Sequence, residues 1–216
     1  MSSKEMSTPS RVIVYIDGFN FYFGLRESKW QRYYYLDYPQ LSKSLIKGLP
    51  GSQLVMTKYF TARISAPEDK RIRQQNYIEV LTLRGQIELL FGNYRDKSFT
   101  CSNYSCNRPN FIPNEKQTDV NIAVGMMSDA FEDKFDIAIL ISGDSDLVPP
   151  IREIKRLFPK KKVMACFPPL RRSKELRKAC SGEVIIKEAD LKNNQLPDLF
   201  SRPSDGYKYH RPDKWA

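Results

Sequence analysis

The sequence has no apolar run that approaches the roughly 20 residues needed for a membrane-spanning helix. Its first ten residues, MSSKEMSTPS, are polar and lack the apolar core of a secretory signal peptide. Only four cysteines occur among 216 residues, too few for a disulfide scaffold in a chain of this length. We therefore expect a soluble, cytoplasmic protein with no membrane contact, in which the thiols stay reduced.

A glycine-rich phosphate loop is also absent after the first apolar segment, RVIVYID (11–17), because the next residues are GFNFYF. This absence counts strongly against a nucleotide-binding Rossmann protein. A phosphohydrolase of the haloacid dehalogenase type would need a second aspartate two residues after Asp17, where Phe19 stands. The single histidine, His210, lies in a polar C-terminal stretch, and we expect neither a ligand nor a catalyst there.

The composition is that of a folded basic protein, with 41% hydrophobic and 12% aromatic residues. The formal net charge is +10, from 35 Lys and Arg against 25 Asp and Glu. Such an excess favours polyanionic partners, such as nucleic acid or an anionic surface. Plain solubilising charge is the alternative interpretation.

Apolar segments typical of strands alternate with helical segments along the chain. Strands are expected at 11–17, 53–64, 86–96, 135–142 and 160–168, with a short sixth strand at 183–188. Helices are expected at 37–49, 67–85, 118–131, 145–158 and 171–180. The strands are continuously apolar, which is typical of a parallel sheet that is buried on both faces. The pattern predicts an α/β, Rossmann-like domain of about five or six parallel strands with helices on both faces.

This domain is expected to span residues 11–190, between a flexible N-terminus (1–10) and a polar C-terminal tail (191–216). Disorder or partner binding is the default for such a tail. An excursion at 97–114 carries Cys101 and Cys106. They supply two thiolates where a structural zinc takes four ligands, so a zinc site shared by two copies is an open alternative. The oligomeric state, including a homo-oligomer, is open too.

Carboxylates stand where predicted strands end and helices begin. Asp17 ends the first strand, Asp144 and Asp146 follow the strand at 135–142, and Asp119 opens a helix. Ligands of open parallel sheets bind beyond the carboxyl ends of the strands. If these two strands are neighbours, their ends lie about 5 Å apart. An all-oxygen cluster there would suit Mg²⁺ or Mn²⁺, whereas each carboxylate taken singly has the alternative of a helix cap or turn.

Three blocks carry a resemblance to a known family: VIVYIDGFNFYF (12–23), EKQTDVNIAVGMMSDAF (115–131) and FDIAILISGDSDLVPPI (135–151). In order and spacing they resemble the signature blocks of the NYN domain, and more narrowly its LabA-like branch, within the PIN-like nuclease superfamily. The resemblance implies a PIN-like α/β domain that binds Mg²⁺ or Mn²⁺ in an acidic pocket and cuts RNA. The expected activity is thus that of a metal-dependent endoribonuclease acting on single-stranded or structured RNA.

The same resemblance supplies the predicted catalytic residues. They are Asp17, Asn20, Asp119, Asp144 and Asp146. The aspartates are the implied metal ligands; Asp146 would orient the attacking water, and Asn20 would position a carboxylate or phosphate oxygen. Many relatives carry a further aspartate about where Gly125 stands, so one metal ion is a safer prediction than two. The alternative function is a catalytically weak or inactive RNA-binding module.

Basic and aromatic residues indicate where RNA would lie. The predicted RNA contacts are Lys116, Arg171, Arg172, Lys174 and Arg177. A further basic group comprises Arg63, Lys70, Arg71 and Arg73. The aromatic residues after Asp17, namely Phe19, Phe21, Tyr22 and Phe23, either stack on bases or form core. A solvated charged face is the alternative for each basic group.

Overall fold

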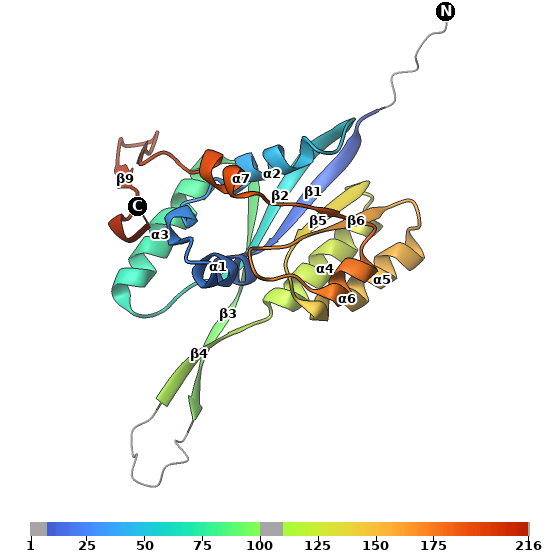
Figure 1. The fold of residues 1–216 in the computed structure, drawn as a ribbon. Helices are drawn as coiled ribbons and strands as arrows, with labels where there is room; N and C mark the ends of the chain where they lie inside the picture. Colours follow the sequence, from blue (N-terminus) through green and yellow to red (C-terminus); the bar gives the residue numbers. More distant parts are fainter. Residues whose placement is uncertain (1–7, 100–109, 216) are drawn as a thin grey trace, which may run out of the picture.

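The computed structural model describes residues 8–99 and 110–215, and nothing is described for 1–7, 100–109 and 216. The strands are β1 (Ser10–Asp17), β2 (Ser52–Ala62), β3 (Ile87–Phe99), β4 (Asn110–Lys116), β5 (Ile137–Ile141), β6 (Lys162–Cys166) and β7 (Gly182–Val184). The helices are α1 (Gly18–Glu27), α2 (Tyr38–Ile46), α3 (Glu68–Arg84), α4 (Thr118–Phe131), α5 (Val148–Leu157), α6 (Lys174–Ala179) and α7 (Glu188–Asn193). Figure 1 shows how they are arranged.

One sheet of seven strands, in the order β4-β3-β2-β1-β5-β6-β7, organises the fold. Six of these strands run parallel, and only β4 is antiparallel to its neighbour. The predicted α/β class, with six parallel strands, is thereby confirmed. The central strand β1 is fully buried from Val12 to Ile16, because helices cover both of its faces. None of the helices in the described part of the chain has the length and apolar character that a membrane span requires.

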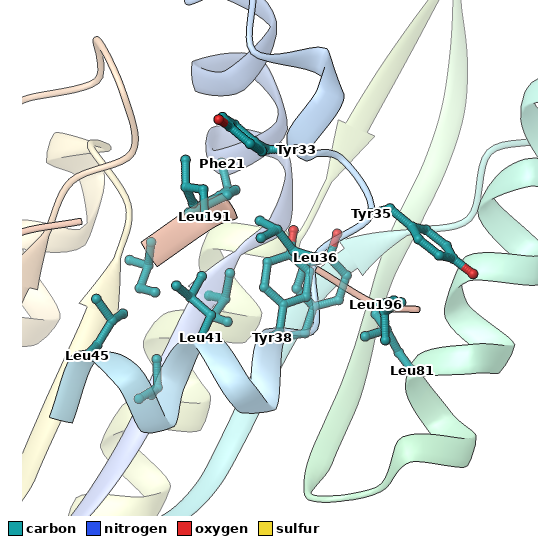
Figure 2. Close-up of a cluster of buried hydrophobic side chains, with 14 of the residues drawn as sticks. Phe21, Tyr33, Tyr35, Leu36, Tyr38, Leu41, Leu45, Leu81, Leu191 and Leu196 are labelled. Carbon is teal, nitrogen blue, oxygen red and sulfur yellow. The ribbon is translucent and has the colours of Figure 1, made fainter. Parts of the chain in front are cut away.

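Two hydrophobic clusters, one on each face, hold the helices to the sheet. Helices α1, α2, α3 and α7 contribute to the first cluster, which is rich in tyrosine and leucine (Figure 2). Helices α4, α5 and α6 contribute to the second cluster on the opposite face (Figure 1). Cys166 lies buried within β6, and Cys180 lies buried just after α6. Burial raises the pKa of the Cys180 thiol to about 11, so this thiol stays protonated at neutral pH.

Helix α4 buries a different face from the one that its sequence suggests. The apolar set Val120, Val124 and Phe131 is exposed, while Ile122 and Met126 are fully buried. The helix is apolar on two sides, so hydrophobic periodicity alone does not choose between them. Contact with β1, β2 and β3 decides which side faces the sheet.

Two segments with polar composition contain secondary structure in the described residues. Strands β3 and β4, at the two ends of the predicted excursion, pair as an antiparallel hairpin. Asn93 lies opposite Lys116, and Phe99 lies opposite Asn110. Figure 1 shows this hairpin projecting away from the body of the domain. Cys101 and Cys106 lie outside the described residues, so the zinc alternative stays a prediction.

The C-terminal segment packs on the domain, although its composition suggested a loose tail. Leu191, Leu196 and Tyr209 belong to the first hydrophobic cluster. The segment continues through β8 (Leu199–Ser201) and β9 (Lys208–His210), which form a two-stranded sheet. His210 is exposed in β9. A few apolar side chains, widely spaced among polar ones, are enough to hold such a segment and leave little trace in its composition.

A buried ionic network joins the sheet to α4. The Lys58 ammonium lies 2.8 Å from Asp129 Oδ2, and Tyr15 donates a 2.7 Å hydrogen bond to the same oxygen. Glu88 approaches Lys58 to 3.1 Å, but its side chain is about half exposed. Burial, reinforced by Asp129, raises the pKa of the Tyr15 phenol well above its usual range. Asp129 is therefore a structural partner of Lys58.

Replacement of Asp129 by Asn should lower the free energy of unfolding by about 3 kcal/mol, because it leaves Lys58 buried beside a neutral amide. Urea titration measures the loss. Glu88→Gln is the matched control and should cost less than about 1 kcal/mol, since solvent screens its exposed carboxylate. Equal losses in the two variants would contradict the assignment of Asp129 as the main partner of Lys58.

Candidate active site

The candidate site lies where the connections leaving the sheet change direction. From β1 the chain moves to β2 on one side, whereas β5 lies on the other side of β1. Ile16 of β1 pairs with Ile141 of β5, so Asp17 and Ser142 follow at adjacent positions of the same sheet edge. The strand neighbourhood on which the metal hypothesis depended is thus present. Crevices at such switch points are the usual ligand sites of open α/β sheets.

Short hydrogen bonds join the ends of β1 and β5. Ser142 Oγ donates to Asp17 Oδ2 at 2.9 Å, and the Gly143 amide donates to Asn20 Oδ1, also at 2.9 Å. Asp17 Oδ1 accepts from the amide of Asn20 at 3.0 Å and thereby caps α1. Asp17 is only 3% exposed. Asp17 and Asn20 are therefore held against the loop that carries Asp144.

Asp144 is held by two further backbone contacts. Its amide donates to Ser142 Oγ at 3.1 Å, and its Oδ1 accepts from the amide of Asp146 at 2.9 Å. It thereby caps the 3-10 turn η2 (Ser145–Leu147) that precedes α5. Asp144 is half-buried and Asp146 is exposed. The capping role proposed as the alternative for Asp144 is present in the structure, and it leaves the second carboxylate oxygen for another role.

Helix α4 brings Asp119 to the same edge. Its first turn contains Asp119 and follows β4. The last residue of β4, Lys116, pairs with Asn93, which comes just after the part of β3 that pairs with β2. The helix also contacts η2. Asp119 is half-buried. Six residues further on, Gly125 faces the Phe60 ring, and a Cβ built at Gly125 would lie 3.4 Å from Phe60 Cζ. An apolar ring thus lies where the resemblance would place a further aspartate.

The carboxylates share an edge but do not form a closed cage. Among the side chains that the structure describes, those of residues 8–92 and 117–215, no three acidic, cysteine or histidine groups are close enough to enclose a metal ion. The donors are nevertheless hard oxygen groups, which suit Mg²⁺ or Mn²⁺. Mg²⁺ commonly keeps several waters and needs only one or two carboxylates. The residues therefore fit a largely hydrated cation, bound by one or two carboxylates such as Asp17 and Asp144, better than a cation enclosed by protein ligands.

A tight backbone contact fixes the loop that carries Asp144. A Cβ built on Gly143 would lie only 1.8 Å from the carbonyl oxygen of Arg171. The turn that follows β6 therefore lies directly against the loop after β5. Sequence reasoning did not anticipate this contact, because nothing in the local sequence marks which backbone approaches Gly143.

The predicted basic contacts with RNA are largely neutralised within the protein. Arg171 pairs with Glu27, while Arg172 and Arg177 both reach Glu183, at 2.7 Å and 2.9 Å. Lys174 is exposed and makes no ion pair within the described part of the chain. The side chain of Lys116 lies outside the described residues. The basic surface around α6 therefore carries less free charge than its sequence suggests.

An aromatic cavity opens beside the acidic edge. Its volume is about 350 Å³, and Gly18 and Phe19, the two residues after Asp17, line it. Tyr59, Tyr38 and Tyr77 line it as well. Burial is the main cause that raises the pKa of the Tyr59 phenol, and the charge of Asp17 adds to it. The sequence signal for this cavity was the aromatic run after Asp17, of which only Phe21 is fully buried core.

Comparison with known proteins settles the family. The family model of the NYN domain matches residues 11–188, which is most of the chain. The chain belongs to the NYN domain family. This NYN domain accordingly falls within the PIN-like nuclease superfamily, as the signature blocks indicated. Assignment to the LabA-like branch stays a prediction.

The chain also resembles individual proteins, among them a curated protein and a solved structure. A protein named 6-hydroxy-3-succinoylpyridine 3-monooxygenase HspA, from Pseudomonas putida (strain DSM 28022 / S16), is 28% identical over 183 residues, covering 72% of this chain. The match spans 59% of that relative's length. A crystal structure of a protein of unknown function from Vibrio parahaemolyticus RIMD 2210633 aligns with a TM-score of 0.53 and 18% identity. It covers 91% of this chain and 100% of its own, which shows a shared fold.

Replacement of Gly143 by Ala should lower the free energy of unfolding by about 2 kcal/mol, because the methyl group overlaps the Arg171 carbonyl and the loop must move. Thermal and urea unfolding measure the effect. Gly125→Ala is the matched control and should stabilise the protein by about 0.5 kcal/mol, since alanine favours helix and the Cβ meets Phe60 at ordinary contact distance. A Gly143→Ala variant as stable as the parent would contradict the close approach.

Proposed function

We propose that this NYN domain is a metal-dependent endoribonuclease that hydrolyses phosphodiester bonds of RNA at the carboxyl edge of β1 and β5. The observation that supports this most is the hydrogen-bonded unit of Asp17, Asn20, Ser142 and Gly143. It holds a buried carboxylate and a side-chain amide at the switch point of the sheet. Membership of a nuclease superfamily supplies the reaction class, and the net charge of +10 suits a polyanionic substrate.

Each side chain has a part that follows from its contacts. Asp17 accepts hydrogen bonds from Asn20 and Ser142, and Asp144 accepts one from Asp146. Both carboxylates would bind a cation directly or through its waters. Asn20 Oδ1 accepts from Gly143, which fixes the amide and leaves its Nδ2 hydrogens to donate to a phosphate oxygen. Asp146, exposed at the edge, orients the attacking water. A bound Mg²⁺ or Mn²⁺ would lower the pKa of that water and offset charge on the phosphate oxygens.

The reaction forms one bond between the water oxygen and phosphorus and breaks one bond between phosphorus and a ribose oxygen. The water loses a proton on attack, and the departing ribose oxygen gains one, so atoms and charge balance. Asp146 accepts the first proton in this scheme. Asn20 and Asp17 keep the phosphate and the water in line, which is the larger part of catalysis in phosphoryl chemistry.

A second candidate is an RNA-binding module without turnover. Two observations favour it: the carboxylates serve as caps and do not enclose a metal ion in the described residues, and Phe60 lies beside Gly125. In this case RNA affinity would persist in EDTA, and no product would form. Cleavage and binding assays on the same preparation separate the two functions.

A third candidate comes from the Pseudomonas relative, which is named a monooxygenase of a hydroxylated pyridine. The aromatic cavity of about 350 Å³ could hold a single heteroaromatic ring. Identity of 28% and coverage of 59% of that protein are too low to transfer its activity. Oxygen uptake in the presence of a hydroxypyridine acid and an added reductant would be the sign of this function.

Purified protein should cleave end-labelled single-stranded RNA with Mn²⁺ or Mg²⁺ and not with EDTA. Asp144→Asn should lower the cleavage rate by about 100-fold or more, because it removes a charged ligand while keeping the hydrogen-bonded shape. Gel analysis of the products over time gives the rate. Cleavage that survives EDTA or the substitution would contradict the proposal and indicate a contaminating nuclease.

Asp133→Asn serves as the matched control for this experiment. Asp133 precedes β5, at the opposite edge of the sheet from Asp144, and its side chain is 70% exposed. Its positive φ of 52° is one that asparagine adopts readily. The control variant should cleave at the parental rate, which shows that the loss in Asp144→Asn reflects its position.

A further inference from the structure

The aromatic cavity beside Asp17 has walls that suit a planar ring. Tyr38 stacks on Tyr59 with ring centroids 4.6 Å apart, and Tyr22 stacks on Tyr34 at 4.8 Å. Trp215 packs edge-on against Tyr34 at 6.0 Å, so the C-terminal segment closes one side. The cavity is at the small end of ligand pockets, which typically measure about 300–1,000 Å³. Its size and walls fit one aromatic ring system with its attached sugar.

The cavity lies next to the acidic edge along the chain. Gly18 and Phe19 line the cavity and directly follow Asp17 in the chain. A Cβ built at Gly18 would lie 2.8 Å from the Tyr59 hydroxyl, so glycine allows α1 to begin against this wall. When a phosphate of an RNA strand lies near Asp17, the base of the neighbouring nucleotide would therefore be within reach of the aromatic cavity.

Free positive charge gathers at this cavity. Arg26 and Lys70 line it, are exposed, and make no ion pair with any carboxylate in the described part of the chain. The Arg26 guanidinium lies 4.6 Å from the centre of the Phe23 ring, a pairing that leaves its charge available to a phosphate. By contrast, Arg171, Arg172 and Arg177 near α6 are all paired with glutamates. The unpaired charge thus favours an anionic ligand on the α1 and α3 side of the site.

We propose that this cavity binds one unpaired base of single-stranded RNA, next to the phosphate at the acidic edge, with Arg26 and Lys70 on the flanking backbone. The inference rests on the proposed nuclease function for its substrate and deepens it by naming the single-stranded form. A base can enter a cavity of this kind only when it is neither paired nor stacked in a helix. Aromatic walls accept every base because each has a π-face.

The test is RNA binding in EDTA, which separates recognition from cleavage. A Trp30→Phe background leaves Trp215 as the sole tryptophan, since the chain has only two. Titration with a single-stranded oligonucleotide should quench Trp215 fluorescence, whereas the matching duplex should bind more weakly. Adenosine monophosphate should give the same quenching at a concentration at least about 100-fold higher, because it lacks the flanking phosphates.

Variants at exposed positions test the cavity without disturbing the core. Tyr22→Ala should weaken oligonucleotide binding about tenfold, and Tyr207→Ala, an exposed tyrosine beyond β8, should not. Lys70→Gln should reduce the slope of log affinity against log salt by about 0.7, as expected when one phosphate contact is lost. Lys178→Gln, a matched exposed lysine on α6, should leave the slope unchanged. Lys174→Gln tests the alternative RNA path along α6. Circular dichroism checks that each variant is folded.

The outcomes distinguish this inference from the proposed function. Binding that depends on Tyr22 and Lys70, with no metal-dependent cleavage, would uphold the base pocket and overturn the nuclease. Metal-dependent cleavage with binding that depends on Lys174 and not on Lys70 would uphold the nuclease and overturn the pocket. Equal affinity for adenosine monophosphate and the oligonucleotide would overturn RNA as the ligand of the cavity and indicate a free mononucleotide. A hydroxypyridine carboxylate that binds where neither nucleotide does would overturn the inference altogether.

Discussion

The pairing of β1 with β5 is the constraint on which the rest of the site depends. The two strands are separated by more than a hundred residues, yet Ile16 and Ile141 are partners, so their carboxyl ends emerge together. The hydrogen bond from Ser142 to Asp17 is a direct result. Because β1 is packed on both faces, a register shift would place each of its side chains in a space shaped for another one and is disfavoured. The position of Asp17 at the end of β1 is therefore fixed by the packing of the core.

The carboxylates at this edge have structural partners as well as a proposed chemical role. Asp17 caps α1 and Asp144 caps η2, which places negative charge at the start of each element where backbone amides are free to donate. The backbone amides thereby hold Asp17 and Asp144 at the edge where a cation or a polarised water would bind. Capping and catalysis are consequently compatible, and the presence of one does not argue against the other. The hydrated character of Mg²⁺ makes a loosely assembled ligand set sufficient.

Charge on the surface cannot be judged by counting basic residues. The segment around α6 is among the most basic in the sequence, but Glu27 and Glu183 pair with three of its arginines, so two negative charges offset part of the positive charge. Arg26 and Lys70 are less conspicuous in the sequence, yet they keep their charge beside an aromatic cavity. Glu27, the partner of Arg171, lies 144 residues away from it in the chain. Pairing across elements, which depends on the tertiary fold, decides which cations remain available.

The sequence alone determined the class of the domain and the order of its principal strands and helices, and it predicted the residues of the acidic edge. Those properties follow from local apolar runs and from the placement of aspartates at their ends. Only the tertiary structure decided that α4 buries Ile122 and not Val124, because that helix is apolar on two sides. It also decided that polar segments form the β3–β4 hairpin and a packed C-terminus, since sparse long-range contacts leave little local pattern. The cavity beside Asp17 likewise joins α1, α3 and Trp215, which only folding brings together.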